Sequence, residues 1–182
     1  TYRMDEEACV AACLAQAQLP QDQAARIQAL AQDLVVAVRA SDMGTGGIGT
    51  AIALAAKSFG LEVIGLNSDG RAVEGFNTCY PGADRLAFAE GLDYLVSVLP
   101  QTAQTNNLID HEVLTRLNPR AIVINAGRGN AVVEADLIAS LNAGHVRAAA
   151  LDVFREEPLP ADDPLWSTPG VNITSHTAGP TP

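Results

Sequence analysis

The sequence of 182 residues contains few basic and few aromatic side chains. It has 11 Lys and Arg against 21 Asp and Glu, which gives a formal net charge of −10. Nucleic-acid affinity depends on Lys and Arg that displace counterions from phosphates, so this balance argues against a nucleic-acid partner. Aromatic residues make up 4% and apolar residues 48% of the chain, which favours helices packed on buried strands over an aromatic-rich β-sandwich. The length fits a single core.

Long hydrophobic runs and a cysteine framework are also missing. Short apolar runs such as YLVSVL and AIVINA fall well below the ~20 residues that a membrane span needs. The first residues, TYRMDEEAC, are acidic where a secretory signal is basic, so we expect a cytoplasmic protein with no membrane partner. Cys9, Cys13 and Cys79 are an odd number, which favours buried small side chains over disulfides or a metal or redox pair. We predict no metal site.

Short apolar runs alternate with helical patterns along most of the chain. Strands are predicted at 34–38, 62–66, 94–99, 121–126, 147–153 and 171–175, and helices at about 48–59, 111–117 and 134–142. This alternation is typical of an α/β fold whose parallel sheet is covered on both faces, a doubly wound, Rossmann-type sheet. Residues 67–84 are predicted to be irregular, and EEPLPADDPLWSTPG, with four prolines, to lack regular structure.

The residues before the sheet form a separate helical pattern. Helical spacing runs over 4–18, Pro20 interrupts it, and a second helix is predicted at about 22–32. We therefore divide the chain into a helical segment, 1–33, and a dinucleotide-binding domain, 34–182. Because the sequence starts with Thr and ends in HTAGPTP without a closing element, we expect it to be part of a longer polypeptide.

A glycine-rich turn follows the first predicted strand. Its spacing, Gly44-x-Gly46-x-x-Gly49, fits the fingerprint in which a helix N-terminus binds a pyrophosphate. The predicted cofactor-binding residues of this turn are Gly44, Gly46, Gly47, Ile48 and Gly49. Residues 39–42 intrude before the first glycine; either they bulge outward, which the intact helix favours, or they distort the loop. The carboxylate of Asp42 would repel a pyrophosphate that lay close to it.

The tip of the second strand, VIGLNSDGR, bears on the choice of cofactor. Asn67 stands where an acidic residue holds the ribose hydroxyls in an NAD site. Ser68 can hydrogen-bond a 2′-phosphate and Arg71 can pair with it, although Asp69 opposes both. We therefore expect NADP in preference to NAD, with Asn67, Ser68 and Arg71 as cofactor-binding residues. A plain polar turn is the alternative.

Four motifs in the second half follow one another in a fixed order: INAGRGNAVVEADLIASLNAG, AALDVFREEPLP, DDPLW and ITSHTAG. Together they resemble the D-isomer-specific 2-hydroxyacid dehydrogenase family, over about residues 44–179. The resemblance implies hydride transfer between NAD(P)H and a small 2-keto or 2-hydroxy acid, and PLPADDPLW favours the glyoxylate/hydroxypyruvate reductase type. It also implies that most of the substrate domain is absent from this chain and that the full-length protein is a homodimer.

The resemblance also assigns roles to individual residues. Arg128 of the N-x-x-R-G motif would bind the substrate carboxylate and carbonyl oxygen; Glu157 of D-V-F-x-x-E-P would pair with His176, which would donate a proton to that oxygen. Further cofactor-binding positions are Leu99, Pro100, Thr102, Ala126, Gly127, Asp152, Ala178 and Gly179. Ser175 and Gly127 depart from the more common Pro and Ala. Taken one at a time, these three residues are more simply interpreted as a surface arginine, a solvated glutamate and a structural histidine. Because all three occur together in the order of the family motifs, we favour an enzyme over a corepressor-like, non-catalytic dinucleotide sensor.

Overall fold

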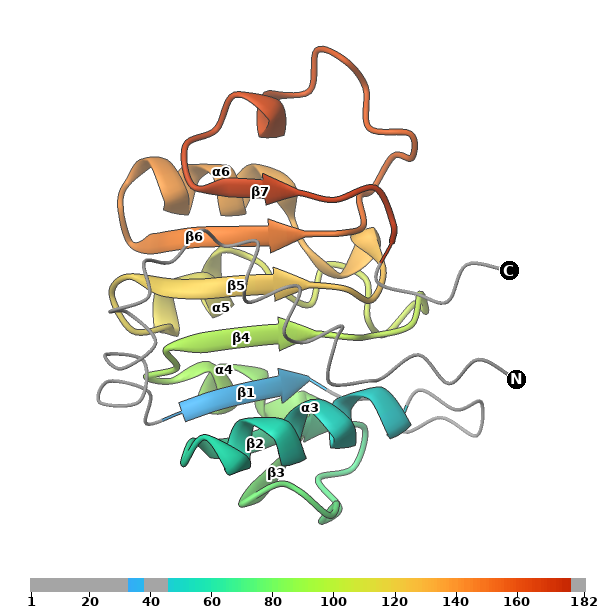
Figure 1. Cartoon of the computed structure of the whole chain (residues 1–182), viewed down its shortest axis with the longest axis vertical. Helices are drawn as coiled ribbons and strands as arrows, with labels where there is room; N and C mark the ends of the chain where they lie inside the picture. The colour runs from blue at the N-terminus through green and yellow to red at the C-terminus, as the bar shows by residue number, and fades with distance from the viewer. Residues whose placement is uncertain (1–32, 38–45, 178–182) are drawn as a thin grey trace.

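A computed structural model of the chain describes residues 33–37 and 46–177 (Figure 1). It contains a seven-stranded parallel sheet in the order β3-β2-β1-β4-β5-β6-β7. The strands are β1 Asp33–Ala37, β2 Glu62–Asn67, β3 Thr78–Pro81, β4 Tyr94–Ser97, β5 Ala121–Asn125, β6 Val146–Leu151 and β7 Val171–Ile173. The order reverses between β1 and β4, so the doubly wound sheet predicted from the sequence is confirmed.

Helices cover both faces of this sheet. They are α3 Gly46–Ser58, α4 Arg85–Ala89, α5 His111–Arg116 and α6 Glu134–Asn142, with short 3₁₀ turns η1 Gly82–Asp84, η2 Gly129–Ala131 and η3 Pro164–Trp166. Helix α3 lies on one face, whereas α4, α5 and α6 lie on the other (Figure 1). The predicted helix at 134–142 is confirmed at both ends, and the other two predicted helices are confirmed within a few residues.

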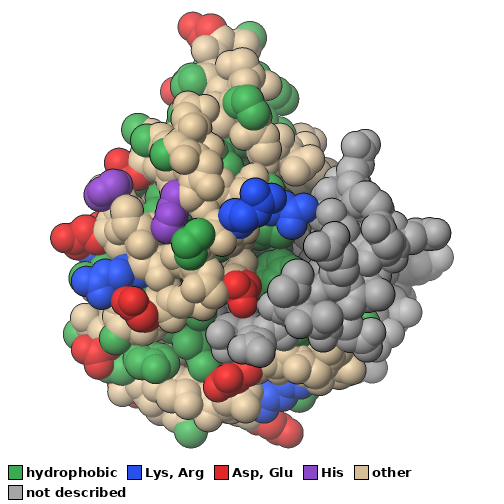
Figure 2. All heavy atoms as spheres, turned by 90° about the vertical axis from the view of Figure 1, so that its left-hand side faces the viewer, with side chains coloured by type: hydrophobic (Ala, Val, Ile, Leu, Met, Phe, Trp, Pro, Cys, Tyr) green, Lys and Arg blue, Asp and Glu red, His purple; other side chains and the backbone are tan. Residues whose placement is uncertain are grey.

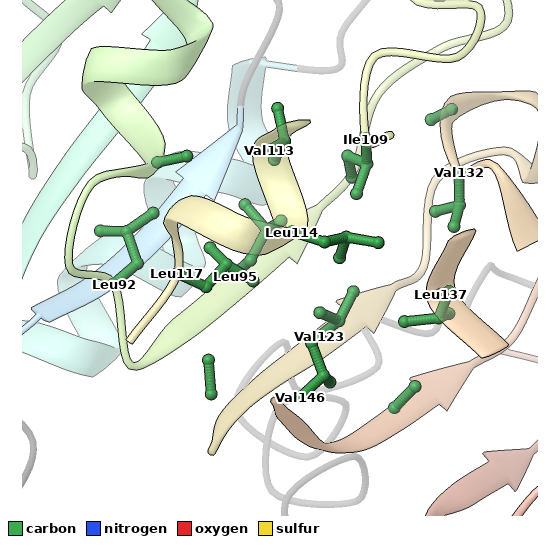
Figure 3. Close-up of a cluster of buried hydrophobic side chains, with 14 of the residues drawn as sticks. Leu92, Leu95, Ile109, Val113, Leu114, Leu117, Val123, Val132, Leu137 and Val146 are labelled. Carbon is green, nitrogen blue, oxygen red and sulfur yellow. The ribbon is translucent and has the colours of Figure 1, made fainter. Parts of the chain in front are cut away.

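Successive residues of the strands point to different hydrophobic clusters. Leu95 of β4 packs in the larger cluster, with Leu114 of α5 and Leu137 of α6, and these three side chains are at most 1% exposed (Figure 3). The next residue, Val96, packs on the opposite face beside Ala53 of α3. Burial on both faces explains why the strands are continuous apolar runs without alternation.

The edge at the amino ends of the strands faces the viewer in Figure 2. Acidic, basic and hydrophobic side chains are interspersed over the described part of this face. The candidate site residues lie beyond the opposite, carboxyl ends of the strands, the side to which the arrowheads point in Figure 1.

The prediction that residues 67–84 are irregular was wrong in part, because β3, with the sequence TCYP, pairs with β2 from Ile64 opposite Thr78 onward. The five-residue helix α4, which follows this stretch and buries Phe88 against the sheet, was not predicted. A four-residue edge strand that ends in proline has too little apolar periodicity to be recognised, and edge strands are where proline is tolerated.

Three strands end two residues earlier than the apolar pattern predicts. β4 ends at Ser97, although Val98 and Leu99 are still buried, and β6 and β7 end at Leu151 and Ile173. After β4 and β6, side chains such as Leu99 and Val153 remain in the core although the backbone has left the sheet, so hydrophobicity alone extends these two predicted strands too far. After β7, Ser175 is exposed, and burial does not account for the difference.

The proline-rich segment 156–170 is held by local hydrogen bonds. The side chain of Asp163 accepts from the backbone N–H of Leu165 at 2.8 Å, and Leu165 is 1% exposed. The indole Nε1 of Trp166 donates to the carbonyl of Pro160 at 2.8 Å. Apart from the turn η3, the segment has no regular structure, as predicted.

Several predictions lie outside the described residues. These concern the helices at 4–18 and 22–32, Cys9, Cys13, residues 39–42, Gly44, Ala178 and Gly179. Among the residues that are described, no helix is both long and apolar enough to span a membrane.

Candidate active site

Three residues with predicted catalytic roles follow the ends of three adjacent strands. Arg128 comes after β5, Glu157 after β6, and His176 after β7. Because these strands are parallel neighbours, their carboxyl ends lie at one edge of the sheet, and the segments that follow them share that edge. In a doubly wound sheet, this edge is where ligands bind.

His176 and Glu157 form a hydrogen-bonded pair. Imidazole Nδ1 lies 2.8 Å from Glu157 Oε2, and the other carboxylate oxygen accepts from the backbone N–H of Phe154 at 2.9 Å. That backbone hydrogen bond first, and then His176 and the charge of Arg128, hold the pKa of Glu157 below its ordinary value. The carboxylate is therefore ionised at neutral pH and can stabilise a protonated imidazole at His176.

Asp152 holds the segment that presents His176. His176 has a φ of +55°, in the left-handed region, and its backbone N–H donates to the Asp152 carbonyl at 2.9 Å. Carboxylate Oδ1 of Asp152 accepts from the N–H of Thr177 at 2.9 Å and from the hydroxyl of Thr174. Asp152, only 5% exposed, thus fixes an otherwise unfavourable backbone conformation. Thr174 and Thr177 were not predicted; their signal is the pair of hydroxyls that flank the histidine in I-T-S-H-T.

Asn125 shapes the turn that carries Arg128. Its side chain, 1% exposed, accepts from the N–H of Gly127 at 3.2 Å and donates to the carbonyl of Arg128 at 3.1 Å. The Arg128 guanidinium is exposed, and it donates to the Gly127 carbonyl at 2.7 Å. The first residue of N-x-x-R-G therefore has a structural task, which sequence reasoning did not assign.

Two glycines in this motif permit close backbone approach. A Cβ on Gly127 would lie 2.5 Å from the backbone nitrogen of Leu99, and one on Gly129 would lie 1.9 Å from the carbonyl carbon of Phe154. The departure from alanine at 127 therefore suits this backbone. The contact at Gly129 brings the Arg128 turn directly against the loop that leads to Glu157.

Helix α3, whose first residues are the described glycines of the glycine-rich motif, begins at the same edge of the sheet (Figure 1). Gly46 is the first residue of the helix, Gly47 and Ile48 are exposed, and Gly49 is buried. A Cβ on Gly47 would meet no atom within 4 Å. A helix N-terminus can accept a phosphate, because its first N–H groups have no partners within the helix.

Asn67 is directed into its own loop. Its Oδ1 accepts from the N–H groups of Asp69 and Gly70 at 3.3 and 2.6 Å, and its Nδ2 donates to the Arg71 carbonyl at 2.8 Å. The side chain is 6% exposed, whereas those of Arg71 and Asp69 are 48% and 58% exposed, with 3.6 Å between their charged groups. Asn67 thus shapes the turn, and Ser68 and Arg71 stand on its exposed side.

The turn after β4 is held by a buried threonine. Thr105, 3% exposed, donates from its hydroxyl to the Pro100 carbonyl at 2.6 Å and accepts from the N–H of Thr102 at 3.0 Å. Leu99 is buried in the core, while Ala126 donates its N–H to Ser97 in the neighbouring strand at 2.9 Å. The backbone of the turn after β4 therefore lies beside the backbone that follows β5, close to the point between β1 and β4 where the strand order reverses.

No group of three or more His, Cys, Asp or Glu side chains that could hold a metal ion occurs among residues 46–177.

Replacement of Glu157 by Gln should change the pH dependence of stability. A carboxyl group whose pKa is lowered by folding contributes stability above its unfolded pKa, and this contribution is lost as pH falls through the folded pKa. We therefore expect wild type to exceed E157Q in free energy of unfolding at neutral pH, and the difference to vanish in acid. Urea unfolding across this range measures it. E156Q, which removes a neighbouring exposed charge, is the control. A difference that persists unchanged in acid would contradict the ion pair.

The doubly wound sheet and the glycine-rich start of α3 define a Rossmann-type dinucleotide-binding domain. The chain matches the family described as D-isomer specific 2-hydroxyacid dehydrogenase, NAD binding domain, over residues 14–178. The chain belongs to this family, and the matched part is its NAD-binding domain.

Relatives with names and solved structures support this membership. The chain is 40% identical over 137 residues to glyoxylate/hydroxypyruvate reductase A of Yersinia enterocolitica, which covers 75% of the chain and 44% of that protein. It therefore spans less than half the length of this curated relative.

Two solved structures show the same fold. A D-isomer specific 2-hydroxyacid dehydrogenase family protein from Aeromonas salmonicida has a TM-score of 0.78 and 35% identity, over 96% of this chain and 58% of that one. An NADPH-dependent glyoxylate/hydroxypyruvate reductase from Sinorhizobium meliloti, in complex with NADP and sulfate, has a TM-score of 0.70 and 33% identity, over 81% of this chain and 46% of that one.

Proposed function

We propose that the full-length protein reduces a small 2-keto acid, of the glyoxylate or hydroxypyruvate type, to the 2-hydroxy acid with NADPH or NADH. The observation that carries the proposal is the pair formed by His176 Nδ1 and Glu157 Oε2, 2.8 Å apart, at the sheet edge that also holds Arg128. The names of the relatives from Yersinia and Sinorhizobium support the same reaction.

Each of the three side chains has a separate task in this reaction. Bound reduced nicotinamide would supply the hydride that adds to the carbonyl carbon. Since Nδ1 of His176 faces Glu157, its Nε2 is the nitrogen that donates a proton to the carbonyl oxygen. Glu157 stabilises the protonated ring before transfer, and Arg128 orients the substrate carboxylate through the planar fork of its guanidinium. In the oxidation direction, His176 accepts the proton instead.

The residues available for the cofactor follow the same edge. Gly46, Gly47 and Gly49 would approach the pyrophosphate at the start of α3, with Ile48 beside them, and the turns after β4 and β5 would line the nicotinamide end. Leu99 and Ala126 would act through their backbone, together with Pro100, Thr102 and Gly127. Asp152, Ala178 and Gly179 complete the proposed set.

NADP is proposed in preference to NAD because Arg71 and Ser68 stand at the tip of β2 without an acidic residue at position 67.

R71A should weaken NADPH binding about tenfold and change NADH binding less than about twofold, since only NADPH offers a 2′-phosphate for the guanidinium. D69A should tighten NADPH binding, because it removes a carboxylate close to Arg71. Fluorescence titration of both cofactors measures these changes. Equal loss for both cofactors in R71A would refute this assignment.

The function is tested by the oxidation of NADPH and NADH by the full-length protein with a panel of 2-keto acids. Turnover of glyoxylate or hydroxypyruvate is the expected result. Cofactor binding without turnover of any 2-keto acid would overturn the proposal and support a non-catalytic dinucleotide sensor.

The homodimer, the division at residue 33 and the cytoplasmic location stay predictions; sedimentation of the full-length protein tests the first of them.

A further inference from the structure

Arg155 is exposed but makes an unusually complete set of hydrogen bonds. Its backbone N–H donates to Glu134 Oε1 at 2.9 Å, and its Nε donates to the Val132 carbonyl at 2.7 Å. Its Nη2 donates to the Asn130 carbonyl at 3.1 Å and to the side-chain oxygen Oδ1 of Asn107. An exposed arginine loses side-chain entropy when it is held in one geometry, so such a set of contacts requires an explanation.

These hydrogen bonds join three segments that are distant in sequence. Asn107 belongs to the segment after β4, Asn130 lies two residues after Arg128, and Arg155 lies two residues before Glu157. Asn107 has a φ of +57°, in the left-handed region, and its N–H also donates to the Asn130 carbonyl at 2.9 Å. The guanidinium of Arg155 thus binds both Asn107 and Asn130, which are also hydrogen-bonded to each other.

The segments joined by Arg155 carry the candidate catalytic side chains. Gly129, next to Arg128, already lies against the backbone of Phe154, where a Cβ would come within 1.9 Å of the carbonyl carbon. The N–H of Phe154 donates to Glu157 Oε1, and Glu157 in turn holds His176. A displacement of Arg155 would therefore move the donor that orients Glu157.

We propose that Arg155 is a positioning residue that fixes the Arg128 turn relative to the loop of the Glu157–His176 pair. The inference rests on the proposed function and extends it, since position 155 is unspecified in the D-V-F-x-x-E-P motif. It is needed because Arg128 and His176 must act on the same substrate molecule, and misplacement by about 1 Å can cost on the order of 100-fold in rate.

Arg116 offers a matched control. It lies at the last residue of α5 and pairs with Glu90 at 2.9 Å, with both side chains at least half exposed. R116M removes the same charge, and with it an ion pair with Glu90, from a helix surface. R155M instead removes hydrogen bonds to neutral oxygen atoms that join the three segments. The comparison separates a positioning role from the general effect of losing a surface arginine.

The first measurement is steady-state kinetics of the full-length protein with variants R155M, R155K and R116M. R155M should lower kcat about tenfold or more, with NADPH binding changed by less than about twofold, because geometry and not cofactor affinity is lost. R155K should recover only part of the rate, since an ammonium lacks the guanidinium fork. R116M should match wild type. If kcat of both Arg155 variants stays within about twofold of R116M, the proposal is wrong.

The second measurement does not depend on turnover. In protein with ¹⁵N-labelled histidine, the Nδ1 signal of His176, assigned by its loss in H176N, reports the hydrogen bond to Glu157. R155M should shift or broaden this signal, and R116M should leave it unchanged. An unchanged signal in R155M would overturn the positioning role even in an inactive protein. Absence of wild-type turnover would instead count against the proposed function alone.

Discussion

Replacement of His176 by Asn should lower the rate of hydride transfer to a 2-keto acid by about 1000-fold while NADPH affinity changes by less than about twofold. Asparagine can form a hydrogen bond but cannot give up a proton to the carbonyl oxygen. The hydrogen bond between His176 Nδ1 and Glu157 shows which ring nitrogen is available for the substrate. Single-turnover stopped-flow with the full-length protein measures the rate, and fluorescence titration measures the affinity.

His111 provides the control for this substitution. It is an exposed histidine at the start of α5, on the surface formed by α5 and α6, where its backbone N–H donates to Asp136 at 2.8 Å. H111N should leave both the rate and the affinity unchanged. If H176N keeps the rate of H111N, the assignment of His176 as proton donor is wrong.

Replacement of Arg128 by Met should lower kcat/KM for the 2-keto acid by about 1000-fold, because it removes the partner of the substrate carboxylate and a donor to the carbonyl oxygen. Among the described residues, the guanidinium donates one hydrogen bond, to the Gly127 carbonyl, and the side chain is exposed. Further N–H groups therefore remain for a substrate. Steady-state kinetics over a range of 2-keto acid concentrations gives the value.

Two further variants define what Arg128 contributes. R128K keeps the charge but loses the planar fork, so its loss should be smaller than that of R128M and should still exceed about tenfold. R116M removes an arginine from the surface of α5 and should have no effect. Equal kcat/KM in R128M and R116M would contradict a role in substrate binding, whereas a weaker affinity for NADPH in R128M would indicate a cofactor contact instead.

The central part of the fold could be predicted from the sequence because its strands are buried on both faces. A continuous apolar run such as AIVIN packs side chains into hydrophobic clusters on both faces of the sheet, which is typical of an interior strand of a parallel sheet. The edge strand TCYP and the five-residue α4 lack such a pattern, and both were missed. Tertiary contacts, and not local periodicity, determine these elements.

The candidate site shows a similar division. Arg128, Glu157 and His176 could be proposed from the sequence because they occupy specified positions of motifs. The residues that contact the segments around them could not be identified in this way. Arg155 donates hydrogen bonds to backbone carbonyls, and Thr174 donates its hydroxyl to Asp152. Contacts of this kind join segments whose spacing in the sequence has no regular period, so only coordinates identify them.

The most direct test of this account is a crystal structure of the full-length protein with NADP⁺ and oxamate, an unreactive analogue of a 2-keto acid. We expect the guanidinium of Arg128 on the oxamate carboxylate and Nε2 of His176 within hydrogen-bond distance of its carbonyl oxygen, with Nδ1 still bonded to Glu157. Oxamate bound elsewhere, or a nicotinamide ring remote from all three side chains, would contradict it.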